Sequence, residues 1–135
     1  MENSGKNKQI LNFHDLIVYQ NLYKAMKIVN IEIIPTLPRE ERFDLVDQMR
    51  RASKAAPALI AEGFAKRFQI KYWSKYLNDT IGECNEMIHH LSVCKDIYGK
   101  FVNSKTCDEL INLYTITCKQ LTKLGQSWRY YHTSK

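Results

Sequence analysis

Apolar residues recur every three or four positions in four successive blocks of this 135-residue chain, and this spacing constrains the fold more than any other feature. Residues at that spacing share one face of an α-helix, so each block predicts an amphipathic helix. The joins between the blocks are short, which favours antiparallel neighbours. The sequence therefore predicts an all-α fold, an up-down-up-down antiparallel four-helix bundle.

Each block has its own predicted buried stripe. The stripes comprise Phe13, Leu16, Gln20, Tyr23, Met26 or Lys27, Asn30, and Ile33 or Ile34 in the first block; Phe43, Leu45, Met49, Ala52, Ala56, Leu59 and Ile60 in the second; Trp73, Leu77, Ile81, Cys84, Ile88, Leu91, Cys94 or Lys95, and Tyr98 in the third; and Leu110, Leu113 or Tyr114, Thr117, Leu121, Leu124 and Trp128 in the fourth. The last stripe is the most regular. Residues 28–34 alternate weakly enough to pass for a strand, but a single strand would have no partner, so we expect helix there.

Prolines predict where the first two helices end and bend. Pro35 and Pro38 separate the blocks, and residues 36–41 have the order of a helix cap, a first-turn proline and first-turn acids. Pro57 lies inside the second block, where it removes one backbone hydrogen bond and crowds the preceding turn. We therefore expect either a kink or a one-residue bulge at residues 53–56.

The remaining boundaries define one domain. Gly99 is well placed to cap the end of the third helix, and Thr106 with Glu109 forms a capping-box pattern at the start of the fourth. We expect residues 1–11 to form a flexible N-terminal arm and residues 12–131 to form a single four-helix domain.

The sequence contains no convincing set of catalytic residues. It lacks glycine-rich phosphate-binding motifs, the GxSxG nucleophile motif and the HExxH zinc motif. Glu86 and His89 form one Glu-x-x-His pair, but a di-iron bundle needs two such pairs and further carboxylates. His89 and His90 are adjacent and point about 100° apart on a helix, which disfavours a shared metal. We expect no enzymatic activity, no cofactor and no metal.

The cysteines and the hydropathy pattern bear on the compartment. Cys84, Cys94, Cys107 and Cys118 match neither a zinc ribbon nor a compact disulfide framework, so we expect reduced, mostly packed thiols. The longest uncharged apolar run, residues 55–61, is far shorter than the roughly 20 residues that span a bilayer. No signal-peptide pattern follows the polar start. These features predict a soluble cytoplasmic protein without a membrane partner.

The charge of the chain favours an anionic partner. Twenty Lys and Arg residues face 14 Asp and Glu residues, a net charge of +6, and residues 52–80 hold five basic and two acidic residues. The candidate nucleic-acid-binding residues are Arg50, Arg51, Lys54, Lys66, Arg67, Lys71, Lys75, Lys119 and Lys123. Such residues would contact phosphates, with salt-sensitive affinity and little sequence specificity. The alternative is a solvated helix surface with no partner.

Spacing and aromatic neighbours refine this set. Arg67, Lys71 and Lys75 stand four residues apart, which places them on one side of the third helix. The nearby aromatic residues that are candidates to stack on bases are Tyr72, Trp73, Tyr76, Tyr130 and Tyr131. For Trp73, packing into the bundle is the favoured interpretation.

Several stretches resemble one protein family. Phe13–Gln20 resembles the pattern F-x-D-L-x-V-[WY]-Q, Phe43–Ala52 resembles F-x-L-x-x-Q-x-R-R-A, and Pro57–Gly63 resembles P-x-x-I-A-E-G. Tyr76–Glu86 resembles F-L-x(4)-G-S-x-x-E, with Glu83 in place of the usual Ser. These patterns are similar to those of the four-helix-bundle proteins encoded in intervening sequences of bacterial 23S ribosomal RNA genes. That group includes the accessory variability proteins of diversity-generating retroelements.

The resemblance covers about residues 13–99. It implies a non-enzymatic four-helix bundle that often assembles as a ring-shaped homopentamer. In the retroelement branch it implies a basic accessory subunit that binds a reverse transcriptase and its template RNA. Within the matching second helix, we expect Gly63 and the alanines to serve close packing, and Glu62 to be a buried or half-buried carboxylate paired with an arginine such as Arg51.

Two functional hypotheses follow. The first is a basic, oligomeric bundle that binds nucleic acid, RNA rather than DNA, as an accessory subunit to a nucleic-acid enzyme such as a retroelement reverse transcriptase. The alternative is an oligomeric protein-interaction scaffold with no nucleic-acid role. The small residues of the second helix and the number of aromatic residues favour this alternative.

Overall fold

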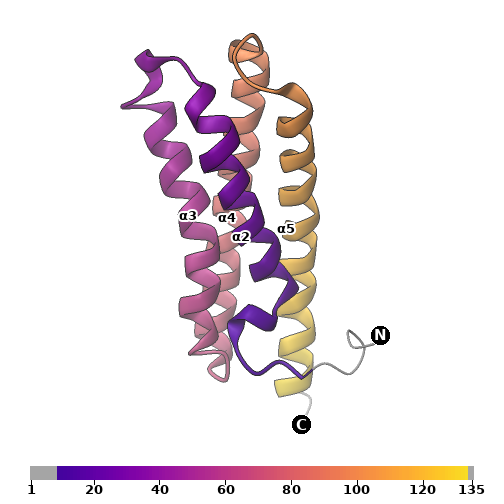
Figure 1. The fold of residues 1–135 in the computed structure, drawn as a ribbon. Coiled ribbons are helices and arrows are strands. Elements are labelled where there is room, and N and C mark those ends of the chain that lie inside the picture. Colours follow the sequence, from indigo (N-terminus) through magenta and orange to yellow (C-terminus); the bar gives the residue numbers. More distant parts are fainter. Residues whose placement is uncertain (1–8, 134–135) are drawn as a thin grey trace.

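Four long helices lie side by side in the computed structural model, which describes the backbone of residues 9–133 and the side chains of residues 9–128 (Figure 1). They are α2 (Ile17–Ile28), α3 (Leu45–Phe64), α4 (Ile70–Tyr98) and α5 (Ser104–Thr133). The described residues include no strand. The predicted all-α four-helix bundle is confirmed.

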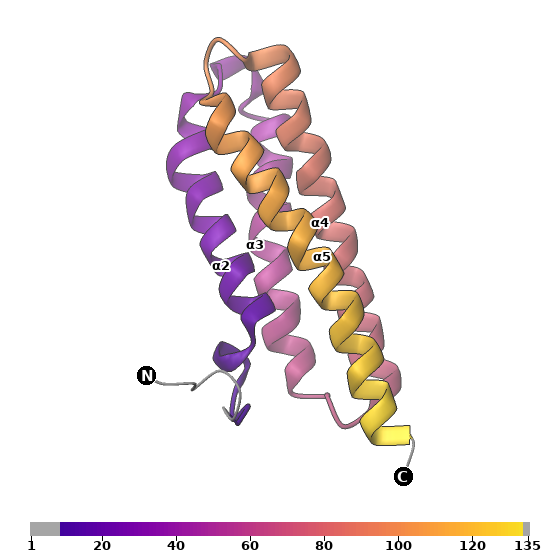
Figure 2. The same ribbon diagram turned by 90° about the vertical axis from the view of Figure 1, so that its right-hand side faces the viewer.

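The helices alternate in direction around the bundle. The start of α2, the α3–α4 turn and the end of α5 lie at one end, and the other two connections lie at the opposite end (Figures 1 and 2). Helix α4 packs against α3 and α5, and α2 packs against the same two helices from the other side. The up-down-up-down arrangement is therefore as predicted, with α2 diagonal to α4. Within the described residues, every helix is too short or too polar to cross a bilayer.

The predicted stripes of α3, α4 and α5 contribute a large part of the core. Their buried members are Leu45, Met49, Ala52, Ala56, Ile60, Trp73, Leu77, Cys84, Leu91, Cys94, Leu110, Tyr114, Thr117 and Leu121. Trp73 is 1% exposed and contacts Phe64 and Trp128 edge to face, which confirms its predicted packing role. The four cysteines are free thiols, and three of them are buried.

The predicted stripe of the first helix is correct near its ends, where Leu16, Ile33 and Ile34 are buried, but it is wrong in its middle. The buried residues of α2 are Val18, Leu22 and Ala25, whereas Gln20 and Tyr23 are exposed. The physical reason lies at Leu16, which has extended backbone angles (φ −77°, ψ 128°) between a short 3-10 turn, η1 (Phe13–Asp15), and α2. A periodicity counted from Phe13 therefore does not continue into the helix.

Residues 28–34 are helical, as predicted, but they are not a regular α-helix. Helix α2 continues into a π-helical turn, η2 (Val29–Ile33), and then a 3-10 turn, η3 (Ile34–Thr36). The wider turn buries Val29 and Ile33 and leaves Ile31 exposed, which explains the weak alternation in the sequence.

The start of α3 differs from the prediction. Pro38 precedes only a 3-10 turn, η4 (Arg39–Glu41), and α3 begins later, at Leu45, because Asp44 has a non-helical backbone (φ −132°, ψ −95°). As a result, Phe43 lies outside the helix and is 80% exposed. The helix then remains α-helical through Pro57, so the predicted bulge is wrong.

The other predicted caps are partly correct. Gly99 follows the last residue of α4, as predicted, but with right-handed backbone angles. Helix α5 begins before the predicted capping box, and its cap is Asn103, whose side-chain oxygen accepts a hydrogen bond from the backbone N–H of Thr106 (3.1 Å). Residues 1–8, most of the expected N-terminal arm, lie outside the described residues.

Candidate nucleic-acid interface

One side of α3 carries a basic residue that is neutralised by acids of α4. The guanidinium of Arg51 donates hydrogen bonds to both carboxylate oxygens of Glu86 (2.7 Å each) and to Glu83 (3.3 Å). These bonds, first to Glu86 and then to Glu83, raise the pKa of Arg51 further. His90 also bonds Glu86 (3.2 Å). Although Arg51 is a predicted nucleic-acid contact, its charge already has two partners.

The carboxylate of Glu86 responds to the same contacts. Partial burial raises its pKa, but the hydrogen bonds from Arg51 and His90 outweigh burial and lower the pKa below its usual value.

The predicted pairing of Glu62 with Arg51 is wrong, because Glu62 is exposed and accepts a hydrogen bond from the Tyr76 hydroxyl (3.0 Å).

The basic residues near the α3–α4 turn do not form the predicted helical stripe. Arg67 lies in the turn itself and not on α4, because α4 begins only at Ile70. Its guanidinium donates to the Phe64 carbonyl (2.9 Å) and lies 4.0 Å from the centre of the Phe64 ring. Lys71 is exposed, and Lys75 pairs with Asp79 (2.8 Å).

The aromatic candidates near this turn have different environments. Tyr72 is 47% exposed, and the Lys66 ammonium lies 5.5 Å from the centre of its ring. Tyr76 is half-buried. The side chains of Tyr130 and Tyr131 lie outside the described residues.

The basic residues of α5 lie apart from those of α3. Lys119 and Lys123 are exposed, and Lys123 lines an apolar groove of about 290 Å³ with Leu16, Ile17 and Val18 of the α2 end. On α3, Arg50 is exposed and lies 3.7 Å from Asp47, while Lys54 is also exposed. The nine predicted residues therefore do not make one continuous patch.

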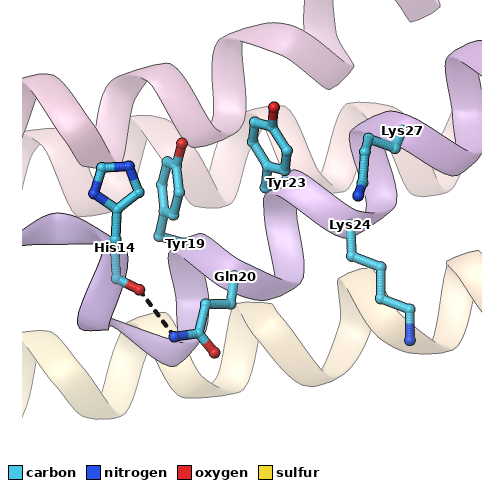
Figure 3. Close-up of a pocket in the computed structure, with 6 residues that line it drawn as sticks. All are labelled: His14, Tyr19, Gln20, Tyr23, Lys24 and Lys27. Carbon is cyan, nitrogen blue, oxygen red and sulfur yellow. Dashed lines mark hydrogen bonds between the residues drawn. The ribbon is translucent and has the colours of Figure 1, made fainter.

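The outer side of α2 carries a pocket that the sequence analysis missed. It has a volume of about 450 Å³ and is lined by His14, Tyr19, Gln20, Tyr23, Lys24 and Lys27 (Figure 3). Tyr19, Tyr23 and Lys27 stand four residues apart and follow one side of the helix. The Tyr19 and Tyr23 ring centres are 5.8 Å apart, and the Lys27 ammonium lies 5.6 Å from the Tyr23 ring centre.

The turn before α2 supports these rings. The extended backbone at Leu16 places η1 beside the helix, where the Phe13 ring stacks on His14 (4.1 Å) and meets Tyr19 edge to face (4.9 Å). The Gln20 side chain donates to the His14 carbonyl (2.8 Å) (Figure 3). Tyr19 is thereby held from one side while Tyr23 stays 43% exposed.

The same tyrosines border a second hollow, between α2 and α3. It has a volume of about 220 Å³ and is lined by Phe13, Tyr19, Tyr23, Met26, Lys54, Pro57, Ala58 and Ala61. Small side chains of α3 leave this hollow open, and Lys54 extends the basic character of α2 onto α3. We call the surface formed by Tyr19, Tyr23, Lys27 and Lys54 the tyrosine–lysine face.

Acidic residues are missing from the lining of this face. No Asp or Glu lines either hollow, and α2 contains none. Among the described residues, Lys24, Lys27 and Lys54 have no carboxylate within ion-pair distance. The sequence held a signal for this face: the four-residue spacing of Tyr19, Tyr23 and Lys27. The predicted stripe of the first helix places Tyr23 in the core and therefore obscures this signal.

Comparison with known families agrees with the resemblance noted in the sequence. The family model described as 23S rRNA-intervening sequence protein matches residues 14–123, which include most of all four helices. No curated protein and no solved structure is significantly similar to the chain. Since the match extends over well more than half of the chain, this protein belongs to the 23S rRNA-intervening sequence protein family.

Proposed function

We propose that this chain is a non-enzymatic accessory subunit that binds RNA through the tyrosine–lysine face. The observation that carries the proposal is the placement of Lys27 and Lys54 beside two hollows that no carboxylate lines. Phosphate groups would meet cations that need not first leave an acidic partner. Arg51, in contrast, would have to break its bonds to Glu83 and Glu86.

The physics of phosphate contacts predicts how this binding behaves. Each lysine that neutralises a phosphate releases a condensed counterion, so affinity falls as salt rises. Two lysines on a single strand give a slope of about −1.4 in a plot of log affinity against log salt concentration. Contacts of this kind carry little sequence information, which suits an accessory subunit whose target is chosen by a partner enzyme.

We further propose a cytosolic homo-oligomer, a ring-shaped pentamer, that serves a nucleic-acid enzyme such as the reverse transcriptase of a diversity-generating retroelement. Family membership supports this placement, and four free cysteines suit a reducing compartment. Repetition of the face around a ring would strengthen weak contacts by avidity. Light scattering coupled to size-exclusion chromatography tests the pentamer, and a monomer or dimer would contradict it.

Fluorescence anisotropy with labelled RNA tests the binding itself. The double variant Lys27→Gln/Lys54→Gln and the control Arg51→Gln/Lys75→Gln each remove two positive charges. We expect the first to weaken binding about tenfold at roughly 50 mM salt and the control to change it less than about twofold. Equal losses would assign binding to net charge alone. Absence of RNA binding by the wild-type chain would overturn the proposal.

The second candidate function is an oligomeric protein-interaction scaffold. The apolar groove between α2 and α5 favours it, because Ile17 in that groove is 55% exposed and its neighbours Leu16 and Val18 continue into the core. Partners that stay bound after nuclease treatment and are lost with Ile17→Glu would support the scaffold. Loss of all partners with nuclease would favour the RNA-binding function.

A further inference from the structure

Tyr23 presents an open aromatic ring at the centre of the tyrosine–lysine face. It is 43% exposed and borders both hollows, one lined also by Lys27 of α2 and the other by Lys54 of α3. We propose that an unpaired base of single-stranded RNA stacks on Tyr23, so that the protein binds single strands in preference to duplex. This inference rests on the proposed function of the same face.

The ring spacing determines where the base lies. Stacked planes are separated by about 3.5 Å, so a base held between two rings needs about 7 Å. The centres of Tyr19 and Tyr23 are 5.8 Å apart and their planes are tilted by 31°, which leaves too little room between them. The base therefore stacks on the other side of Tyr23, where the Lys27 ammonium now lies 5.6 Å from the ring centre. Lys27 has a flexible stem and can turn from the ring to a phosphate.

Tyr19 acts as a positioning residue for this contact. Phe13 meets its ring edge to face at 4.9 Å and His14 does so at 5.4 Å, so the Tyr19 ring is held by two neighbours. Figure 3 shows the rings of His14, Tyr19 and Tyr23 in a row on one side of α2, with Gln20 and Lys24 on the other. A supported row of rings loses little conformational freedom when a base binds.

The shape of the site favours single strands. Bases in a duplex already stack on their neighbours, and only unpaired bases offer a free face to an aromatic side chain. The hollow on α2, of about 450 Å³, is within the size range of small-ligand pockets and has room for one nucleotide. Binding needs both the open ring and the lysines, because the ring stacks on the base and the ammonium groups contact the phosphate backbone of the RNA.

The closest comparison within the chain is Tyr72, an exposed tyrosine that also has a lysine over its ring, Lys66 at 5.5 Å. The residues lining the hollow around Tyr23 include no acid, whereas the Lys66 ammonium near Tyr72 also lies 5.9 Å from the ring of Tyr76, whose hydroxyl donates a hydrogen bond to Glu62. The Glu62 carboxylate on this neighbouring tyrosine disfavours a phosphate at that lysine. This difference is why we place the base on Tyr23.

Anisotropy with three labelled RNAs tests the inference: a single strand of about 12 nucleotides, a hairpin duplex, and an abasic strand that keeps the phosphates without the bases. We expect wild-type protein to bind the single strand about tenfold more tightly than the abasic strand. This measurement needs no variant. Equal affinity for the base-containing and abasic strands, or tighter binding of the duplex, would overturn the inference.

Variants locate the contact. We expect Tyr23→Ala to weaken binding of the single strand about tenfold and to leave binding of the abasic strand unchanged, while Tyr23→Trp retains affinity. Phe43→Ala is the matched control, because Phe43 is an exposed aromatic residue beside an arginine in the connection between η4 and α3, outside the tyrosine–lysine face. Equal losses on both strands with Tyr23→Ala would contradict stacking. Failure of the proposed function differs: the wild-type chain would then bind none of the three RNAs.

Discussion

Arg51 and Lys54 lie three residues apart on α3 and carry the same charge, but their surroundings are opposite. Arg51 faces α4, where Glu83 and Glu86 hold its guanidinium at 3.3 and 2.7 Å. Lys54 faces α2, where it borders an open hollow with Tyr19 and Tyr23 and no acid. The partners on the neighbouring helix therefore decide whether a basic residue stabilises the fold or remains available for an anionic ligand.

The two sides of α3 also differ in packing. Toward α4, Gly63 lies so close to Tyr76 that an added Cβ would come within 2.5 Å of the Tyr76 Cβ. This agrees with the predicted packing role of Gly63. Toward α2, Pro57, Ala58 and Ala61 leave a hollow of about 220 Å³. Small residues thus permit close packing on one side of the helix and create an open surface on the other.

The largest expected effect comes from filling the close-packed side. We expect Gly63→Ala to destabilise the fold by about 2 kcal/mol, because the new methyl group meets atoms near the Tyr76 backbone that cannot easily move. Urea denaturation measures the loss.

Gly82→Ala is the matched control. Gly82 lies in the middle of α4 with nothing within 4 Å of an added Cβ, so the same change should stabilise the protein by about 0.5–1 kcal/mol. Equal effects of the two substitutions would contradict the packing difference.

The second effect concerns the paired cation. We expect Arg51→Ala to destabilise the protein by about 1 kcal/mol, because Glu83 and Glu86 lose their cationic partner. The loss is modest because the Arg51 side chain is 55% exposed and solvent screens the ion pair. Lys54→Ala should change stability by less than about 0.5 kcal/mol. Thermal or urea unfolding of both variants measures the contrast, and a larger loss for Lys54→Ala would reverse it.

The third prediction removes the electrostatic difference between the two sides of α3, so that neither Arg51 nor Lys54 has an acidic partner. In the Glu83→Gln/Glu86→Gln variant, Arg51 loses its charged partners and becomes available to phosphate. We expect RNA affinity to rise about threefold, equivalent to about 0.6 kcal/mol, and the salt dependence to steepen. Anisotropy measures both quantities. An unchanged affinity would show that the position of Arg51, and not its pairing, keeps it from RNA.

The sequence predicted helices better than it predicted surfaces. The long stripes of α4 and α5 follow one uninterrupted period, so many of their buried residues could be identified, although Thr80, Met87 and His90 were not. The buried residues in the middle of α2 could not, because the extended backbone at Leu16 breaks the register. Likewise, Arg51 and Lys54 look equivalent in the sequence. The acids that distinguish them are more than 30 positions away and reach Arg51 only through the α3–α4 turn.

The smallest expected effect is a pH dependence confined to the paired side. Because the folded-state pKa of Glu86 lies below its usual value, the ionised carboxylate contributes stability above its unfolded pKa of about 4.3, and this contribution is lost as pH falls through the folded pKa. Arg51→Ala removes one cause of the lowered pKa. We therefore expect the difference in unfolding free energy between wild type and Arg51→Ala to shrink from pH 7 to about pH 3, while the difference for Lys54→Ala stays constant. Urea unfolding across this range measures both differences, and a constant gap for Arg51→Ala would show that its contacts with Glu86 contribute packing and not charge.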